Sequence, residues 1–403
     1  MELKGKYTNA KIYATVIEQE AIDQIQTLID NPVSEGSKVR IMPDCHSGKG
    51  CTIGSTMTIT DKIVPNLVGV DIGCGVLAIK LNVKRNEIDL EQVDKAIRKV
   101  IPLGFSVHQN PVDPTDTVEL LHKLKCFKAL VNIPRIVHSR GSLGGGNHYI
   151  ELNEGADETL WLVIHTGSRN LGQQVALYYQ AIAEANMKRR YEEHILKVRE
   201  AVKAMQDKTQ IRPFLEANHM SSPTKAELGL AYLEGNEMQA YLHDMDLVQQ
   251  YAVRNRHSIG ELICRELGWI TTGFITSIHN YIDVDNMILR KGAISARKGQ
   301  KVIIPLNMED GSILAIGKGN DDWNNSAPHG AGRIMSRKKA KEQINVEEVK
   351  QSMAHAGVFT TSINENTIDE AKKAYKDPQA ILDVVGDTLD IVDIIKPIYN
   401  LKG

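Results

Sequence analysis

Residues 67–81 read LVGVDIGCGVLAIKL, an apolar run of the kind found in buried β-strands. Glycines interrupt this run in its middle, and a strand broken in this way usually brings its backbone close to another group. The polar residues at the break are Asp71 and Cys74. A carboxylate and a thiolate from one turn can both bind a divalent transition metal. The stretch therefore predicts a strand that carries a candidate metal site.

Other parts of the chain show the same alternation of strand and helix patterns. Further strands are expected at 62–70, 75–83, 159–167, 274–282 and 301–306, where apolar and β-branched residues cluster. The spacing of apolar residues predicts helices at 90–100, 117–133, about 172–206 and 238–267. The order of these elements is not a regular βαβ alternation, and no linker or repeat divides the chain. We expect a mixed α and β fold in a single domain that spans residues 1–403.

The composition is that of a soluble globular protein, with 42% apolar and 24% charged residues among 403. No run of about 18 apolar residues predicts a membrane span, and the first residues lack a signal-peptide pattern. Five cysteines without paired spacing argue against a disulfide framework. We therefore expect a cytoplasmic protein with no membrane association. The net charge is −2, so a nucleic acid would need a local basic patch, for which 187–200 and 333–343 are candidates.

Polar residues that could carry chemistry gather at strand ends and in glycine-rich turns, where a scaffold commonly presents functional groups. A histidine in such a place is usually an ordinary surface or core residue, but several of them after successive strands favour a shared site. One carboxylate, one thiolate and three imidazoles form a plausible ligand set for transition metals, and a thiolate can bridge two ions. Two ions about 3.5–4 Å apart are a common clamp for phosphoryl transfer. The polar residues at the strand ends and in the glycine-rich turns are Asp44, His46, Asp71, Cys74, Asn147, His148, Glu151, His165, Arg169, His279, Asn280, Lys291, His329 and Arg333.

The stretch NNSAPHGAGRIMSR, residues 324–337, places His329 in a glycine-rich turn. Gly330 and Gly332 permit positive φ angles and a close approach of the backbone to a ligand, and Arg333 could hold a phosphate with two hydrogen bonds. A neutral imidazole beside a bound phosphate can attack phosphorus and form a covalent phosphoramidate. No Walker-type phosphate loop occurs in the chain, so a nucleotide would be bound by other means.

Eight short motifs occur in an order that resembles the RtcB family of RNA ligases. They extend over nearly the whole chain from residue 44 to 403. The resemblance implies central β-sheets flanked by helices around a dinuclear metal site. The motifs are DCHSGKG (44–50), GVDIGCGV (69–76), GGGNHYIEL (144–152), HTGSRNLG (165–172), HNY (279–281), RKGA (290–293), APHGAGR (327–333) and KPIYNLKG (396–403).

The resemblance implies a GTP- and manganese-dependent ligase that joins an RNA 3′-phosphate, or a 2′,3′-cyclic phosphate, to a 5′-hydroxyl. In this family a histidine attacks the α-phosphate of GTP and becomes guanylylated as pyrophosphate leaves. The GMP then passes to the RNA 3′-phosphate, and the 5′-hydroxyl attacks that activated end and expels GMP. The expected partners are therefore RNA ends and GTP, with RNA repair or tRNA splicing as the process. We expect a monomer.

Carried over by position, the family pattern assigns a role to each matching residue. Cys74 would be shared by two manganese ions, with Asp71 and His148 on one ion and His165 and His279 on the other. His329 would be the nucleophile, and Asp44 would orient it. Phosphates would meet Arg169, Lys291 and Arg333, and the GMP pocket would comprise Asn147, Tyr149, Glu151, His329, Gly330, Ala331, Gly332 and Lys402.

Two alternatives use the same residues differently. A metal-dependent phosphodiesterase or phosphatase would keep the ligands but would need neither GTP nor a histidine adduct. A non-catalytic protein that binds RNA ends or nucleotides would hold zinc in closed sites, and sulfur and nitrogen donors do suit zinc. The loop PLNMEDG at 305–311 differs from the more glycine- and serine-rich loop of the family pattern, and its effect on nucleotide preference stays open. So do the physiological RNA, the need for an archease-like activator and activity on DNA ends.

Overall fold

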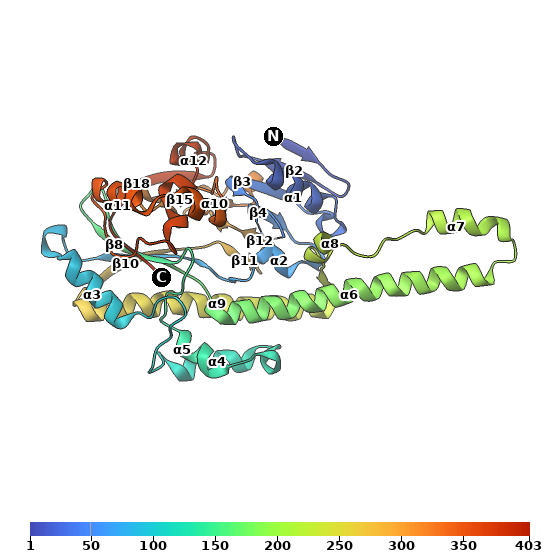
Figure 1. Cartoon of the computed structure of the whole chain (residues 1–403), viewed down its shortest axis with the longest axis horizontal. Helices are drawn as coiled ribbons and strands as arrows, with labels where there is room; N and C mark the ends of the chain where they lie inside the picture. Colours follow the sequence, from blue (N-terminus) through green and yellow to red (C-terminus); the bar gives the residue numbers. More distant parts are fainter. Residues whose placement is uncertain (49) are drawn as a thin grey trace.

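The computed structural model describes residues 1–48 and 50–403 of the chain. Two large β-sheets lie at its centre, with helices around them (Figure 1). The first sheet has the order β1-β2-β3-β4-β12-β11, in which β2 and β3 are parallel and the other neighbours antiparallel. Its strands are β1 (Glu2–Lys4), β2 (Asn9–Ile12), β3 (Val39–His46), β4 (Ile53–Thr58), β11 (Asn280–Asp283) and β12 (Ile288–Lys291).

The second sheet has eight strands in the order β10-β6-β8-β7-β18-β15-β14, with β17 parallel to β18 beside this path. Its two end strands, β10 and β14, contact each other, so the sheet is curled. The strands are β6 (Gly75–Leu81), β7 (Tyr149–Glu154), β8 (Leu160–Thr166), β10 (Thr271–Ile278), β14 (Lys301–Asn307), β15 (Gly311–Gly317), β17 (Phe359–Thr360) and β18 (Leu389–Lys402).

Two further strand pairs and twelve α-helices accompany the two sheets in the described part of the chain. The pairs are β5 (Lys62–Ile63) with β9 (Leu233–Glu234), and β13 (Ala293–Ser295) with β16 (Ser326–Pro328). The helices are α1 (Gln19–Ile29), α2 (Pro65–Val68), α3 (Leu90–Val100), α4 (Pro114–Lys123), α5 (Ile133–Ser139), α6 (Arg169–Ala204), α7 (Ile211–Ala217), α8 (Lys225–Gly229), α9 (Gly235–Leu267), α10 (Arg337–Gln343), α11 (Val346–His355) and α12 (Pro378–Val385).

Helix α9 packs against the second sheet and links it to its neighbouring helices. It contacts β6 and β8 on one side and α3 and α6 on others. Its buried residues recur every three or four positions, as expected for one face of an amphipathic helix. Ile259 and Ile263 on that face join the core of the second sheet. This packing places the middle of α9 directly behind the ends of β6 and β8.

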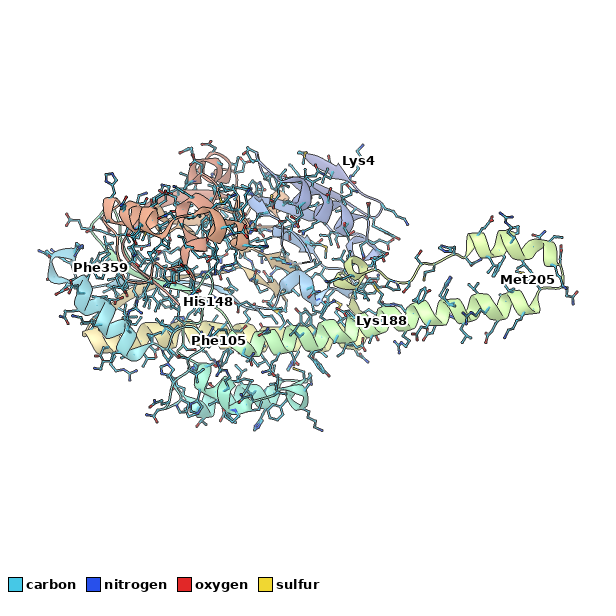
Figure 2. All side chains as sticks on the ribbon, in the orientation of Figure 1. Lys4, Phe105, His148, Lys188, Met205 and Phe359 are labelled. Carbon is cyan, nitrogen blue, oxygen red and sulfur yellow. The ribbon has the colours of Figure 1, made fainter. Side chains whose placement is uncertain are left out.

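Helix α6 begins at the end of β8 and extends far beyond the sheets (Figure 1). All its fully buried residues lie between Leu171 and Ala183, so residues 184–204 form an outer half without any. Helix α7 returns along this outer half, beyond Lys188 (Figure 2). His194 Nε2 lies 2.9 Å from the carbonyl oxygen of Asn218. The chain thus carries a helical arm that projects from the body.

The expected strand at 62–70 is wrong for most of its length. Only Lys62–Ile63 pair as β5, and Pro65–Val68 form α2. Pro65 stands at the start of this helix, where a missing N–H costs nothing, and Gly69 ends it with a φ of 96°. The expected helix at 117–133 is also interrupted, because α4 ends at Lys123 and α5 starts only at Ile133. The expected strand at 274–282 is divided at His279 into β10, which belongs to the second sheet, and β11, which belongs to the first. The other expected strands and helices are present within a few residues of their predicted bounds.

The predicted mixed α and β fold with central sheets and surrounding helices is confirmed. Two large groups of buried apolar residues form the core. One joins the first sheet to α1, α6 and the first part of α9, and the other lies between the second sheet, α3 and the end of α9. Among the residues that the structure describes, no helix is both long enough and apolar enough to span a membrane.

Candidate active site

Five candidate metal ligands from distant parts of the chain meet at the ends of strands. Asp71 and Cys74 lie in the turn between α2 and β6, and His148 directly precedes β7. His165 lies near the end of β8, and His279 follows β10. Because β6 is paired with both β8 and β10, these segments end side by side. Their ligand atoms form two groups, each within 4.8 Å: Cys74 with His165 and His279, and Asp71 with Cys74 and His148.

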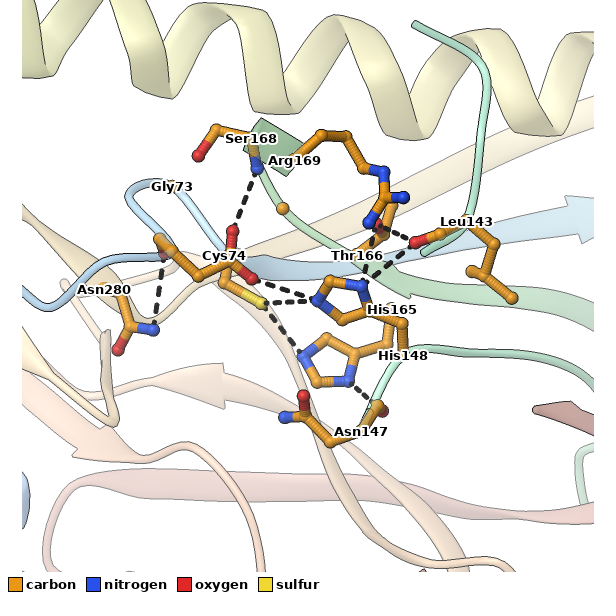
Figure 3. A network of polar contacts seen from close by, with 12 residues as sticks. Gly73, Cys74, Leu143, Asn147, His148, His165, Thr166, Ser168, Arg169 and Asn280 are labelled. Atoms are coloured by element: carbon orange, nitrogen blue, oxygen red, sulfur yellow. Dashed lines mark hydrogen bonds and ion pairs between the residues drawn. The ribbon is translucent and has the colours of Figure 1, made fainter. Parts of the chain in front are cut away.

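Cys74 is the member common to both groups (Figure 3). Its Sγ lies 3.3 Å from His165 Nε2 and 3.7 Å from His148 Nε2. On one side His148 Nε2 is 3.0 Å from Asp71 Oδ2, and on the other His165 Nε2 is 3.4 Å from His279 Nε2. A thiolate at such a junction can bridge two ions, so the donor set fits a dinuclear centre of transition metals.

Backbone carbonyls orient two of the imidazoles. His148 Nδ1 lies 3.0 Å from the carbonyl oxygen of Leu143, and His165 Nδ1 lies 3.0 Å from that of Asn147. A carbonyl only accepts, so each Nδ1 carries a proton, and each Nε2 is left facing the ligand cluster around Cys74. Burial also lowers the pKa of His165 and His279 well below the usual value. The rings of His165 and His279 are therefore held neutral, the form that binds metals.

Asp71 is held as a carboxylate. Burial raises the pKa of its carboxyl, but hydrogen bonds from His148 and Cys74, together with the charge effects of His148 and His165, outweigh burial and bring the pKa to about 2. The backbone N–H of Ser168 donates to Oδ1 at 3.1 Å. Gly167 allows this approach, because a Cβ there would lie 2.1 Å from Asp71 Oδ1. The acidic ligand is thus ionised and positioned by the segment that follows His165.

His329 lies beside this cluster and is bound to Asp44. Its ring centre is 5.0 Å from that of His279, and its Nδ1 is 2.6 Å from Asp44 Oδ2. The same oxygen accepts from the backbone N–H groups of His329 and Gly330, each at 3.1 Å. Asp44 is fully buried, at an irregularity in the pairing of β3 with β4. An ionised Asp44 fixes the proton on Nδ1, so Nε2 of His329 carries the free lone pair.

A close backbone contact keeps the His329 turn against Asp44. Gly332 has a φ of 76°, and a Cβ there would lie 2.2 Å from the carbonyl oxygen of Asp44. A larger residue at 332 would separate the turn from β3. The glycine-rich sequence around His329 therefore has a local physical cause, which is the contact that orients the histidine.

A cavity of about 730 Å³ opens beside the histidines. His165, His279 and His329 lie at one side of it. The expected GMP-pocket residues line it as well: Asn147, Tyr149, Glu151, Gly330, Ala331, Gly332 and Lys402. The structure thus brings the candidate nucleophile and the candidate nucleotide-binding residues to one cavity.

A buried acid and three cations form the far wall of this cavity. Glu370 pairs with Arg333 at 3.2 Å, Arg337 at 2.7 Å and Lys402 at 3.5 Å. Burial opposes ionisation of Glu370, but Lys402 and the two arginines outweigh it and hold the pKa of that carboxyl at about 2. Tyr375 completes the cluster, with its hydroxyl 2.5 Å from Glu370 Oε2. Arg333 is therefore ion-paired at the cavity wall, close to any anion bound there.

Two residues expected to meet phosphates lie outside the cavity lining. The Arg169 guanidinium donates to Ser142 Oγ and, at 2.8 Å, to the carbonyl oxygen of Gly104. Lys291 is buried, and its Nζ donates to the carbonyl oxygen of Asn66 at 3.1 Å. Neither belongs to the set that lines the cavity. Both lie near the ligand-bearing segments and not on the wall that carries Arg333.

Glu370, Arg337 and Tyr375 also line the cavity, but their sequence context does not predict this. Glu370 and Tyr375 stand in a polar segment without a glycine turn or strand end, the signal used for the other candidates. Arg337 lies in the basic stretch at 333–343, which was noted only as a candidate nucleic-acid patch. The variant loop at 305–311 does reach the site, since Pro305 to Met308 line the cavity.

Glu151 gives the cavity a titrating group near neutral pH. Burial raises the pKa of its carboxyl to about 7, although Asn400 donates a hydrogen bond to it at 2.7 Å and Lys402 is near. The folded protein therefore binds this proton more tightly than the unfolded chain does. This preference for the protonated carboxyl stabilises the folded state at low pH. The stabilisation is lost as the pH rises toward and through about 7, where the buried Glu151 carboxyl must ionise.

We expect Glu151→Gln to gain in unfolding free energy relative to the unaltered protein as the pH rises from about 5 to about 8, because glutamine does not ionise. Urea unfolding of both proteins across this range measures the difference, in which other titrating groups cancel. A difference that stays constant with pH would show that Glu151 ionises normally.

Comparison with known proteins gives a consistent result. The family model described as tRNA-splicing ligase RtcB matches residues 24–133 and 122–403. The chain is 29% identical over 400 residues to the RNA-splicing ligase RtcB of Escherichia coli (strain K12), covering 91% of this chain and 90% of the relative. It is 28% identical over 389 residues to RNA-splicing ligase RtcB1 of Escherichia coli (strain ATCC 25922), with 91% and 90% covered. The tRNA-splicing ligase RtcB of Methanococcus maripaludis is 26% identical over 450 residues, with 90% and 87% covered.

Proposed function

Because this chain belongs to the RtcB family, we propose that it is an RNA ligase that uses GTP to join an RNA 3′-phosphate, or a 2′,3′-cyclic phosphate, to a 5′-hydroxyl. The observation that carries the proposal is the His329–Asp44 pair at the edge of a cavity, next to the candidate metal ligand His279. A hydrolase could use an imidazole oriented in this way as a general base, so the histidine adduct and the dependence on GTP are what separate the two functions.

The first step forms a covalent bond between His329 and GMP. Nε2 of His329 attacks the α-phosphorus of GTP, a P–N bond forms, and the bond to the bridging oxygen breaks so that pyrophosphate leaves. Asp44 keeps the proton on Nδ1 and stabilises the positive charge that develops on the ring, the role of the acid in a catalytic triad. Arg333 and Arg337 lie on the same cavity wall and would offset negative charge on the phosphates.

The later steps return the histidine to its starting state. An oxygen of the RNA 3′-phosphate attacks the phosphorus of the bound GMP, and the P–N bond breaks with its electrons returning to Nε2. The RNA 5′-hydroxyl then attacks the activated 3′-phosphate, loses its proton and expels GMP. Water must first hydrolyse a 2′,3′-cyclic phosphate to a 3′-phosphate, because the oxygens of the opened monoester carry more negative charge and are better nucleophiles than those of the cyclic diester.

Two divalent ions, which we propose to be manganese, would neutralise phosphate charge and orient the reacting oxygens when bound. Cys74 would be shared, with Asp71 and His148 completing one site and His165 and His279 the other. Carbonyl groups hold the Nδ1 atoms of His148 and His165, so these rings need little reorganisation to bind an ion. The donor set supports a dinuclear centre, and the choice of manganese rests on the family.

The cavity also has groups that suit guanine. Lys402 can donate to the O6 and N7 acceptors of the base, and ionised Glu151 can accept from N1–H and the exocyclic amine. The Lys402 Nζ lies 5.0 Å from the centre of the Tyr149 ring, so both belong to one wall. Adenine would present a donor to Lys402, which has no acceptor. We therefore propose that the cavity binds the GMP portion of GTP.

The test is a reaction with GTP labelled at the α-phosphate, manganese, and RNA that carries a 3′-phosphate and a 5′-hydroxyl. We expect acid-labile label on the protein and joined RNA that depends on GTP and not on ATP. Release of phosphate from RNA ends without GTP, with no label and no joined product, would favour a phosphodiesterase or phosphatase. Tightly held zinc with no reaction on either substrate would favour a non-catalytic binding protein.

A further inference from the structure

Two polar side chains of α9, Asn255 and Arg256, are buried behind the candidate metal ligands. They are 0% and 1% exposed, and their neighbours along the helix face are apolar core residues. Among the described residues, neither forms an ion pair or hydrogen bond with a carboxylate. A buried arginine without a carboxylate is costly, so the contacts that it does make require explanation.

Arg256 links the segments that carry ligands of both metal groups. Its Nη1 donates to the carbonyl oxygens of Gly73 and Thr166, each at 2.8 Å. Gly73 lies between Asp71 and Cys74, and Thr166 follows His165. One guanidinium nitrogen therefore ties the turn before β6 to the end of β8. Nη2 has no hydrogen-bond partner among the described residues.

Asn255 makes the matching connection to the segment of His148. Its Oδ1 accepts from the backbone N–H of Gly141 at 2.8 Å, and its Nδ2 donates to the carbonyl oxygens of Ser142 at 3.3 Å and Gly167 at 3.1 Å. Ser142 directly precedes Leu143, the residue whose carbonyl oxygen orients the His148 ring. The two adjacent side chains together join the three segments that carry Asp71, Cys74, His148 and His165.

We propose that Asn255 and Arg256 are positioning residues that hold these ligand segments in a metal-binding arrangement before any ion arrives. The positive charge of Arg256 also lies near Asp71 and Cys74, the two ligands that are anionic in a metal complex. The inference rests on the metal centre of the proposed function and not on its ligase chemistry. Outer-shell partners of this kind contribute roughly 10- to 100-fold to metal affinity.

Cobalt titration of the metal-free, full-length protein tests this proposal. Arg256→Met keeps the length of the side chain but removes all its donors and its charge. We expect its cobalt affinity to fall by about 10- to 100-fold, together with a weaker sulfur-to-cobalt absorption band at equal total cobalt. Arg256→Lys, which keeps the charge and part of the donor capacity, should recover part of this loss.

Arg254→Met is the matched control. Arg254 is the neighbouring arginine two residues earlier on α9, and it pairs with Asp116 at 2.9 Å instead of with a ligand segment. We expect native cobalt affinity in this variant. Thermal unfolding of each metal-free variant separates loss of folding from loss of binding, because a merely structural Arg256 would lower the unfolding temperature and leave the cobalt affinity of the folded protein unchanged.

An unchanged cobalt affinity in folded Arg256→Met protein would overturn the proposal. If Arg256→Met gives too little folded protein, Asn255→Ala decides instead, and native cobalt affinity in that variant would overturn the proposal equally. The titration contains neither GTP nor RNA, so it is independent of the ligase assay. A protein that binds two ions but joins no RNA would contradict the proposed function and leave this inference intact.

Discussion

Replacing His329 by alanine should abolish covalent labelling by GTP and reduce RNA joining by at least about 10³-fold. The methyl group has no lone pair to attack phosphorus, and among the described residues that line the cavity no other imidazole has its Nδ1 bound to a carboxylate. His165 and His279 point their Nε2 atoms toward each other in the metal cluster, whereas the Nδ1 of His329 is bound to Asp44. Labelling with α-labelled GTP and joining of RNA ends measure the two losses separately.

A control and a contrary outcome make the His329 prediction sharp. His194→Ala removes a histidine on the arm formed by α6 and α7, where its ring contacts only the Asn218 carbonyl among the hydrogen bonds of the described residues. That variant should label and join RNA normally. A His329→Ala protein that folds, binds metal and still accepts label would place the nucleophile on another residue.

Cys74→Ser should lose both ions together and thereby lose ligation. The thiol is the one ligand common to the two groups, so its removal lowers the donor count of each. A serine hydroxyl is a much poorer ligand for transition metals than a thiolate. We expect metal affinity to fall by more than the roughly 100-fold typical of outer-shell changes, with metal content per protein falling from two toward zero. Elemental analysis after dialysis measures this content.

Cys264→Ser is the appropriate control for the thiol. Cys264 is also buried, but it lies on α9 against the core of the second sheet, away from the ligand clusters. We expect this variant to keep both ions. If Cys74→Ser retained one ion at full affinity, the two groups would not share their sulfur, and the dinuclear interpretation would be wrong.

The candidate ligands were recognisable from the sequence because each one follows a strand or occupies a glycine turn. Asp71 and Cys74 interrupt an apolar run, and His165 and His279 end two others. Strand pairing then explains why they meet, since β6 lies between β8 and β10. His329 had a weaker local signal: its glycine-rich turn and the nearby Arg333 made it a candidate nucleophile, and the family resemblance supported that choice.

Other features depend on contacts that no local pattern reveals. Glu370 pairs with three cations from two distant segments, Arg333 and Arg337 in one and Lys402 in the other, so these contacts are visible only after folding. Asn255 and Arg256 are visible in the sequence as polar residues that interrupt the apolar face of a predicted helix. The groups that they bind lie elsewhere in the chain, so the sequence does not show their role. The helix α2 was mistaken for strand because its short apolar sequence fits both forms, and Pro65 with Gly69 decided between them.

The outer half of α6 gives the molecule an uneven distribution of local stability. A helix of this length is roughly 54 Å long, and it starts beside Ser168, whose N–H binds Asp71. Its first turns are buried, whereas residues 184–204 have no fully buried side chain. Opening the distal turns therefore exposes little apolar surface, and their amides can exchange with solvent by local unfolding. The same helix thus has one end packed beside the candidate metal ligand Asp71 and another end that opens at little cost in buried apolar surface, so the tip can fray while the end beside Asp71 stays folded.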